Sequence, residues 1–285
     1  MLPLDGAADE WHLGRRQSAK SDTLPAAMNG KVTLPALQQM KGDGRKIVAV
    51  VLYDCQLAQI ADRAGVDIVS AGDSVGVTLW GHVSESDVTV DQMLLVCQAV
   101  RRGVVRALVS ADVPLAALRD GPEAAAQVAR RLVRDGGADL VKVDVGASSA
   151  DAVRAITRSN IPVWAQFGMA GDPSAAVVDR LVREAQLLEE AGASLLDFRH
   201  SGAVAGPAVV RAATIPVIGG LGGGPWLDGR VRSLPAALGY VASAIDDRTE
   251  RYANVATTAL AAIKALCDDV RAARPLRGAV PAPRS

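Results

Sequence analysis

Short apolar segments of strand length recur along the chain and alternate with segments of helical periodicity, and this alternation constrains the fold more than any other feature. Such a pattern is typical of a parallel sheet with helical crossovers. The apolar segments are continuous, which indicates strands that are buried on both faces. The expected strands occupy residues 46–52, 66–71, 107–112, 139–144, 161–166, 195–199, 215–218 and 229–233.

This number of strands in 285 residues predicts a single-domain α/β protein, a (β/α)8 or TIM barrel. A doubly wound open sheet would produce a similar order of elements, but the strand count and the polar residues at strand ends favour the barrel. A short helix is expected to follow Thr33 and to plug the barrel base. The other expected helices cover residues 57–64, 89–103, 122–136, 149–159, 174–192 and 246–273.

The barrel and its terminal helices are expected to span residues 31–274. Residues 1–30 are polar and lack periodicity, so we interpret them as a mobile N-terminal tail. The proline-rich residues 275–285 predict a flexible C-terminal tail.

Composition narrows the class of partner. Lys plus Arg equal Asp plus Glu at 31 each, which argues against a nucleic-acid surface or an electrostatic membrane anchor. The three cysteines fit no metal spacing, and we expect them to be reduced. No apolar run approaches the ~18 residues of a membrane span, and the first residues do not resemble a signal peptide. We therefore expect a cytoplasmic protein with a small-molecule partner.

Carboxylates close three of the expected strands. In a barrel the carboxyl ends of the strands meet at one mouth, where chemistry gathers. Converging carboxylates would repel one another unless a divalent cation lay among them, and oxygen ligands favour Mg²⁺. Such a cation can chelate a 2-oxo acid and stabilise its enolate. The candidate residues at the mouth are Asp73, Ser74, Asp112, Lys142, Asp144, Gln166 and Arg199.

Simpler interpretations stay open for each residue. A single Asp at a strand end can cap the next helix, and Lys142 can neutralise Asp144, which shares its strand face. The run Gly219–Gly224 could cradle phosphate, but it lacks a Walker lysine, so a tight turn is favoured. His82 and His200 are interpreted as structural, and strand alternation directs His200 away from the barrel axis.

Several motifs resemble those of one family, in family order and over most of the expected barrel. They include Gly72-Asp73-Ser74-Val75-Gly76, Gly81-His82, Ala111-Asp112-Val113-Pro114, Val141-Lys142-Val143, Glu190-Ala191-Gly192-Ala193 and Ile215-Pro216-Val217-Ile218-Gly219. The chain thereby resembles ketopantoate hydroxymethyltransferase, a metal-dependent (β/α)8 family related to the phosphoenolpyruvate mutase and isocitrate lyase group.

The resemblance implies a metal site and a reaction. It implies that Asp73 and Asp112 hold Mg²⁺, that Asp144 lies in the outer shell, and that Ser74 and Lys142 contact the 2-oxo acid. The family removes the C3 proton of 2-oxoisovalerate and adds the one-carbon unit of methylenetetrahydrofolate, giving ketopantoate. The family also forms large rings, so the resemblance implies a homo-oligomer.

The departures from the family concern catalysis. The family's catalytic glutamate falls at Arg199, which cannot accept a proton, and its histidine falls at Gln166. The family's long loop after the fifth strand is missing at residues 168–173, and Pro235-Ala236 replaces a His-Asp pair. These changes cast doubt on one-carbon transfer from folate.

Replacing a carboxylate with a guanidinium makes the site more positive. Arg199 is therefore expected to bind an added anionic group, such as that of a dicarboxylate or phosphorylated 2-oxo acid, or a developing oxyanion. A simpler alternative is an ion pair between Arg199 and Asp197. Three functions follow: a diverged transferase, a C–C lyase or hydrolase of the mutase type, or a barrel without turnover that binds a metabolite.

Overall fold

Eight parallel strands close into one barrel in chain order, as the sequence predicts. The computed structural model describes residues 30–144, 150–168 and 174–278. Residues 1–29 of the expected N-terminal tail and 279–285 of the expected C-terminal tail therefore lie outside the described residues. The strands are β1 (Ile47–Leu52), β2 (Ile68–Ala71), β3 (Leu108–Asp112), β4 (Leu140–Asp144), β5 (Val163–Gly168), β6 (Leu195–Arg199), β7 (Val217–Gly219) and β8 (Gly229–Ser233).

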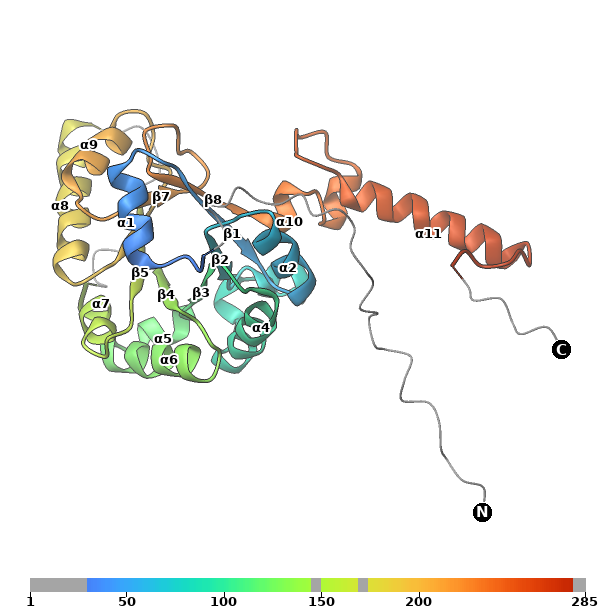
Figure 1. Ribbon diagram of the computed structural model, residues 1–285, viewed down its shortest axis with the longest axis horizontal. Helices are drawn as coiled ribbons and strands as arrows, with labels where there is room; N and C mark the ends of the chain where they lie inside the picture. The colour runs from blue at the N-terminus through green and yellow to red at the C-terminus, as the bar shows by residue number, and fades with distance from the viewer. Residues whose placement is uncertain (1–29, 145–149, 169–173, 279–285) are drawn as a thin grey trace, which may run out of the picture. The chain divides into compact units, whose positions relative to one another are not determined.

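Helices lie around the outside of the strands (Figure 1). The predicted crossover helices are confirmed as α2 (Cys55–Arg63), α4 (Val90–Gly103), α6 (Pro122–Arg134), α7 (Ala150–Thr157) and α8 (Ala175–Glu190). Capping residues fix two of their starts. The Thr89 hydroxyl accepts from the backbone N–H of Gln92 at 3.2 Å to begin α4, and the Asp54 carboxylate accepts from Leu57 at 2.9 Å in the first turn of α2.

The structure corrects two expectations about helices. Helix α9 (Ala205–Ala212) is absent from the prediction because Gly206 and Pro207 weaken its helical signal; the packing of Val209 in the core stabilises it. The predicted helical span 246–273 is wrong at its start, since α11 covers only Val255–Arg271. Short helices also occur as α3 (Val75–Leu79), η2 (Glu85–Asp87), α5 (Leu115–Arg119), α10 (Leu234–Ala237) and η3 (Ala242–Ile245).

Helix α1 (Leu34–Gly42) covers the amino-terminal end of the barrel, as expected. Its N-cap Thr33 accepts a hydrogen bond from the backbone N–H of Ala36 at 3.3 Å. Leu37 is fully buried and packs in a cluster with inward-facing residues from the barrel base, namely Ile47, Ile68, Leu108, Leu140, Trp164, Leu195 and Ile218. This apolar layer closes one end, so polar chemistry is confined to the other.

Polar side chains replace this apolar layer nearer the carboxyl ends of the strands. In β4, Leu140 lies in the base cluster, and Lys142 and Asp144 follow on the same face. Ser70, Ser110, Gln166 and Asp197 are also buried. Among the described residues, no helix combines the length and hydropathy needed to cross a membrane.

Candidate active site

Two strand-end carboxylates approach each other at the mouth of the barrel. Asp112 ends β3, and its Oδ2 accepts a hydrogen bond from the backbone N–H of Asp73 at 3.3 Å. Its Oδ1 accepts from the hydroxyl of Ser70 on β2 at 3.3 Å. Gly72 is required here by its packing against β1, because a Cβ at this position would lie 2.4 Å from a methyl of Val51. The fold therefore brings Asp112 against the backbone of Asp73, and their shared metal role stays a prediction.

The surroundings of Asp73 disfavour its negative charge in the absence of a cation. Burial, followed by the carboxylates of Asp112 and Glu85, raises the pKa of Asp73 to about 8. Glu85, from η2, was not expected at the site, because no sequence signal indicates that the segment between β2 and α4 lies close to the mouth of the barrel. A divalent cation would remove the repulsion between these acids.

We predict that this repulsion makes the metal-free protein less stable as pH rises. The folded surroundings raise the pKa of Asp73 from the ordinary value of 3.8, which applies to the unfolded chain, to about 8. The stability due to the protonated form is complete below the lower value and is lost as pH rises through the higher one. With a chelator present above pH ~8, Asp73→Asn should raise the melting temperature by roughly 2–4 °C, the shift expected for about 1 kcal/mol.

Thermal melts followed by circular dichroism at about pH 4 and at about pH 9 test this. Near pH 4 the variant and the parent should melt together, and Mg²⁺ should stabilise only the parent at high pH. An equal shift at both pH values would contradict the prediction.

The donor set fits Mg²⁺. This ion uses one or two carboxylates and keeps water or substrate oxygens in its other positions, and Asp73 and Asp112 supply such a pair. Within the described ranges, no three His, Cys, Asp or Glu side chains gather closely enough to hold an ion by themselves. Asp144 lies at the rim instead, with Oδ2 3.6 Å from Nη1 of Arg199. Its metal role stays a prediction.

Lys142 is held by two buried partners. Its Nζ donates to Oε1 of Gln166 at 2.6 Å and lies 3.3 Å from Oδ2 of Asp197. The same Nζ lies 5.5 Å from the ring centroid of Trp164. Burial disfavours the ammonium, but the carboxylates of Asp112 and Asp197 outweigh it and raise the pKa of Lys142 above its ordinary value. Lys142 is therefore a fixed cation.

These contacts correct two alternatives from the sequence. Lys142 pairs with Asp197 rather than neutralising Asp144, and Arg199 pairs with Asp144 rather than with Asp197. These pairings follow from how deep each residue lies in the barrel. Asp144 and Arg199 each lie two residues farther along their strands, so one pair is buried and the other is at the rim.

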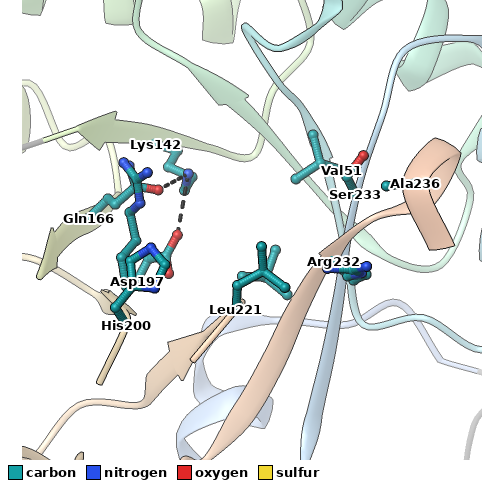
Figure 2. A pocket seen from close by; sticks show the side chains of 12 residues that line it. Val51, Lys142, Gln166, Asp197, His200, Leu221, Arg232, Ser233 and Ala236 are labelled. Carbon is teal, nitrogen blue, oxygen red and sulfur yellow. Dashed lines mark hydrogen bonds and ion pairs between the residues drawn. The ribbon is translucent and has the colours of Figure 1, made fainter. Parts of the chain in front are cut away.

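The site residues line two adjoining pockets at the mouth. The acidic pocket, about 180 Å³, is lined by Val51, Asp73, Ser74, Glu85, Asp112, Val113, Lys142, Asp144, Gln166 and Arg199. The basic pocket, about 280 Å³, is lined by Val51, Lys142, Gln166, Asp197, Arg199, His200, Gly220, Leu221, Val231, Arg232, Ser233 and Ala236. Figure 2 shows the basic pocket, with Lys142, Gln166 and Asp197 on one side and Arg232 and Ser233 on the other. All seven side chains predicted for the site line one or both pockets.

Sequence reasoning missed other contributors. Tyr53 forms a hydrogen bond through its hydroxyl to Oγ of Ser74, 2.7 Å away, and so fixes a predicted substrate contact. Arg232 on β8 lines the basic pocket. The sequence did not predict this, because Arg230 and Arg232 alternate with other residues along β8 and both are exposed. His200 also lines this pocket, contrary to expectation, because its left-handed backbone, with φ at 50°, ends the strand alternation after Arg199.

The glycine-rich run forms a turn, as favoured, and borders the basic pocket through Gly220 and Leu221. The predicted shortening after β5 concerns residues 169–173, which lie outside the described residues.

Comparisons with known proteins point to one family. The profile of the family described as "Ketopantoate hydroxymethyltransferase" matches residues 31–275. The chain is 34% identical to the 3-methyl-2-oxobutanoate hydroxymethyltransferase of a Cyanothece species over 253 residues, covering 84% of this chain and 96% of the relative. It is 35% identical over 263 residues to the enzyme of that name from Alkalilimnicola ehrlichii, covering 87% and 93%.

Solved structures share the fold at lower identity. A 2,3-dimethylmalate lyase of the PEP mutase/isocitrate lyase superfamily superposes with a TM-score of 0.59 at 14% identity, covering 88% of this chain and 92% of that one. A phosphonopyruvate hydrolase in complex with oxalate and Mg²⁺ has a TM-score of 0.56, with the same identity and coverage. The profile match and the identity over nearly the whole barrel place this enzyme in the ketopantoate hydroxymethyltransferase family.

Proposed function

We propose that the protein catalyses Mg²⁺-dependent enolate chemistry on a 2-oxo acid and adds a hydroxymethyl unit, with a substrate that differs from 3-methyl-2-oxobutanoate. The observation that carries this proposal is the Asp73–Asp112 pair beside a buried, charged Lys142. The curated relatives are named for a 2-oxo acid. The hydrolase neighbour was solved with oxalate, an anion that chelates as a 2-oxo acid does, together with Mg²⁺.

Residues of the acidic pocket would bind and orient the substrate. Asp73 and Asp112 would hold Mg²⁺, which when bound supplies Lewis-acid polarisation of the keto group. Lys142 has three N–H donors; one bonds Gln166 and one faces Asp197, which leaves the third for a substrate oxygen. The Ser74 hydroxyl, fixed by Tyr53, offers a second contact.

Removal of the C3 proton needs an acceptor other than Arg199, since a guanidinium does not deprotonate in proteins. Gln166 cannot titrate either, so its role is to hold Lys142. Asp197 and His200, which border the basic pocket, are the remaining side chains that can accept a proton there. Methylenetetrahydrofolate as the one-carbon donor stays a prediction, as do a homo-oligomeric state and a cytoplasmic location.

The guanidinium at position 199 also favours a second candidate. A C–C lyase or hydrolase generates an enolate by bond cleavage and needs no base for a C3 proton. Arg199 would then bind an anionic group of the substrate or the developing charge. Such chemistry fits the same acidic pocket.

Proton exchange distinguishes these functions. The protein is incubated with Mg²⁺ and a 2-oxo acid in deuterated water, and loss of the C3 proton signal is followed by NMR. Exchange above the protein-free rate supports the transferase. Metal-dependent binding without exchange, together with cleavage of a 2-oxo acid, supports the lyase. Binding without either reaction leaves a barrel that only holds a metabolite, and absence of metal-dependent binding rules out all three.

Restoring a base at position 199 should increase exchange. We expect Arg199→Glu to raise the exchange rate of 3-methyl-2-oxobutanoate at least about tenfold, because a positioned general base contributes roughly 10²–10⁴-fold. Arg199→Gln is the matched control, since it removes the guanidinium without adding a base. Equal rates in the two variants would show that the residue at 199 does not limit proton removal.

A further inference from the structure

Acidic and basic side chains are unevenly distributed between the two pockets at the mouth of the barrel. The acidic pocket contains the carboxylates of Asp73, Glu85, Asp112 and Asp144, whereas the basic pocket contains one carboxylate, Asp197, with the guanidinium groups of Arg199 and Arg232 and the imidazole of His200. The two pockets share Val51, Lys142, Gln166 and Arg199, so they adjoin along one wall. A ligand held at the acidic end can therefore extend past Lys142 into the basic end.

The two arginines of the basic pocket have little internal compensation. The side chain of Arg199 is 54% exposed and lies 3.6 Å from the equally exposed Asp144, which makes a weak pair. The side chain of Arg232 makes no hydrogen bond or ion pair within the part of the chain that the structure describes, although its backbone pairs with β1. In Figure 2 it lies across the pocket from Lys142 and Asp197. Arg232 also lines a third cavity, separate from the acidic and basic pockets, together with Glu250 and Arg251.

The glycine-rich turn that borders the basic pocket accepts hydrogen bonds from β8 and from the end of β6. Arg230 donates from Nε to the carbonyl oxygen of Gly219 at 3.1 Å and from Nη2 to that of Gly220 at 2.9 Å. From the other side, the backbone N–H of His200 donates to the carbonyl oxygen of Leu221 at 3.2 Å. The glycine-rich turn is therefore hydrogen-bonded from both sides.

The lining indicates which anion fits. Val51, Leu221, Val231 and Ala236 supply apolar walls that suit a short hydrocarbon chain. A guanidinium presents a planar fork that matches a carboxylate. We propose that the basic pocket binds a second carboxylate at the far end of the substrate, which is therefore a 2-oxo dicarboxylate. This inference rests on the proposed function, and it assigns Arg232 as a specificity-determining residue.

Binding calorimetry with a matched ligand pair tests the inference. In the presence of Mg²⁺, 2-oxoglutarate should bind about tenfold or more tightly than 2-oxopentanoate, which has the same carbon chain but a terminal methyl. Arg232→Ala should remove most of this preference while leaving 2-oxopentanoate affinity unchanged. Arg102→Ala is the matched control, since it removes one exposed arginine of the outer helix α4 and should preserve the preference.

Other outcomes would overturn the assignment. Equal affinity for the two acids, with metal-dependent binding of both, rejects the dicarboxylate and leaves the proposed function intact. Loss of the preference in Arg102→Ala as well would attribute it to overall charge. If glutarate binds without Mg²⁺ and alongside 2-oxopentanoate, the pocket serves a separate anionic molecule. If neither 2-oxo acid binds, the proposed function fails together with the inference.

Discussion

Asp112→Asn is expected to lower Mg²⁺-dependent C3 exchange by about 10³-fold, which corresponds to about 4 kcal/mol of lost transition-state stabilisation. The asparagine has the shape of the aspartate, and its Oδ1 can still accept one hydrogen bond from Ser70 or the Asp73 backbone. The variant should therefore fold, while the proposed metal site would lose one of its two anionic ligands. Exchange kinetics at several Mg²⁺ concentrations and calorimetric Mg²⁺ titration check this.

A distant acid provides the control for Asp112→Asn. Asp179 is exposed on the outer helix α8, so Asp179→Asn makes the same change in charge without affecting the mouth. This variant should keep the parent's exchange rate and Mg²⁺ affinity. Retention of exchange within about tenfold of the parent by Asp112→Asn would remove the basis for a metal site at this pair.

Lys142→Met is expected to destabilise the protein by about 3–5 kcal/mol, because it leaves the Asp197 charge buried without a partner. Asp197 is only 2% exposed, and its Oδ1 already lacks a hydrogen-bond partner among the described residues. Denaturant unfolding measures the loss. Exchange activity should fall as well, because the proposed donor to the substrate is gone.

A double variant separates stability from function. Lys142→Met with Asp197→Asn removes both charges, so at least half of the lost stability should return, whereas exchange should not. If Lys142→Met alone costs less than about 1 kcal/mol, the buried pair contributes little to stability.

Much of the barrel could be predicted from sequence because its physical signals are local. Continuous apolar strands and capped helices reflect burial and hydrogen bonding within a few residues, so β6 and β8 were predicted with their observed bounds. Helix α9 was not predicted, because Gly206 and Pro207 weaken the helical signal of its sequence and the helix is stabilised by its packing in the core. The gathering of Asp73, Asp112 and Lys142 follows from barrel topology, in which strand ends must share a mouth.

The sequence by itself determined the barrel, the family and the strand ends that carry the acids, because periodicity and motif order are properties of the chain. The tertiary structure decided which charges meet: Lys142 with Asp197 at depth, and Arg199 with Asp144 at the rim. It also brought Glu85 from η2 and Arg232 from β8 to the mouth, although neither residue belongs to a recognised motif. The reason is that pairing between strands depends on stagger and depth in the closed barrel, and these are fixed only when all eight strands are assembled.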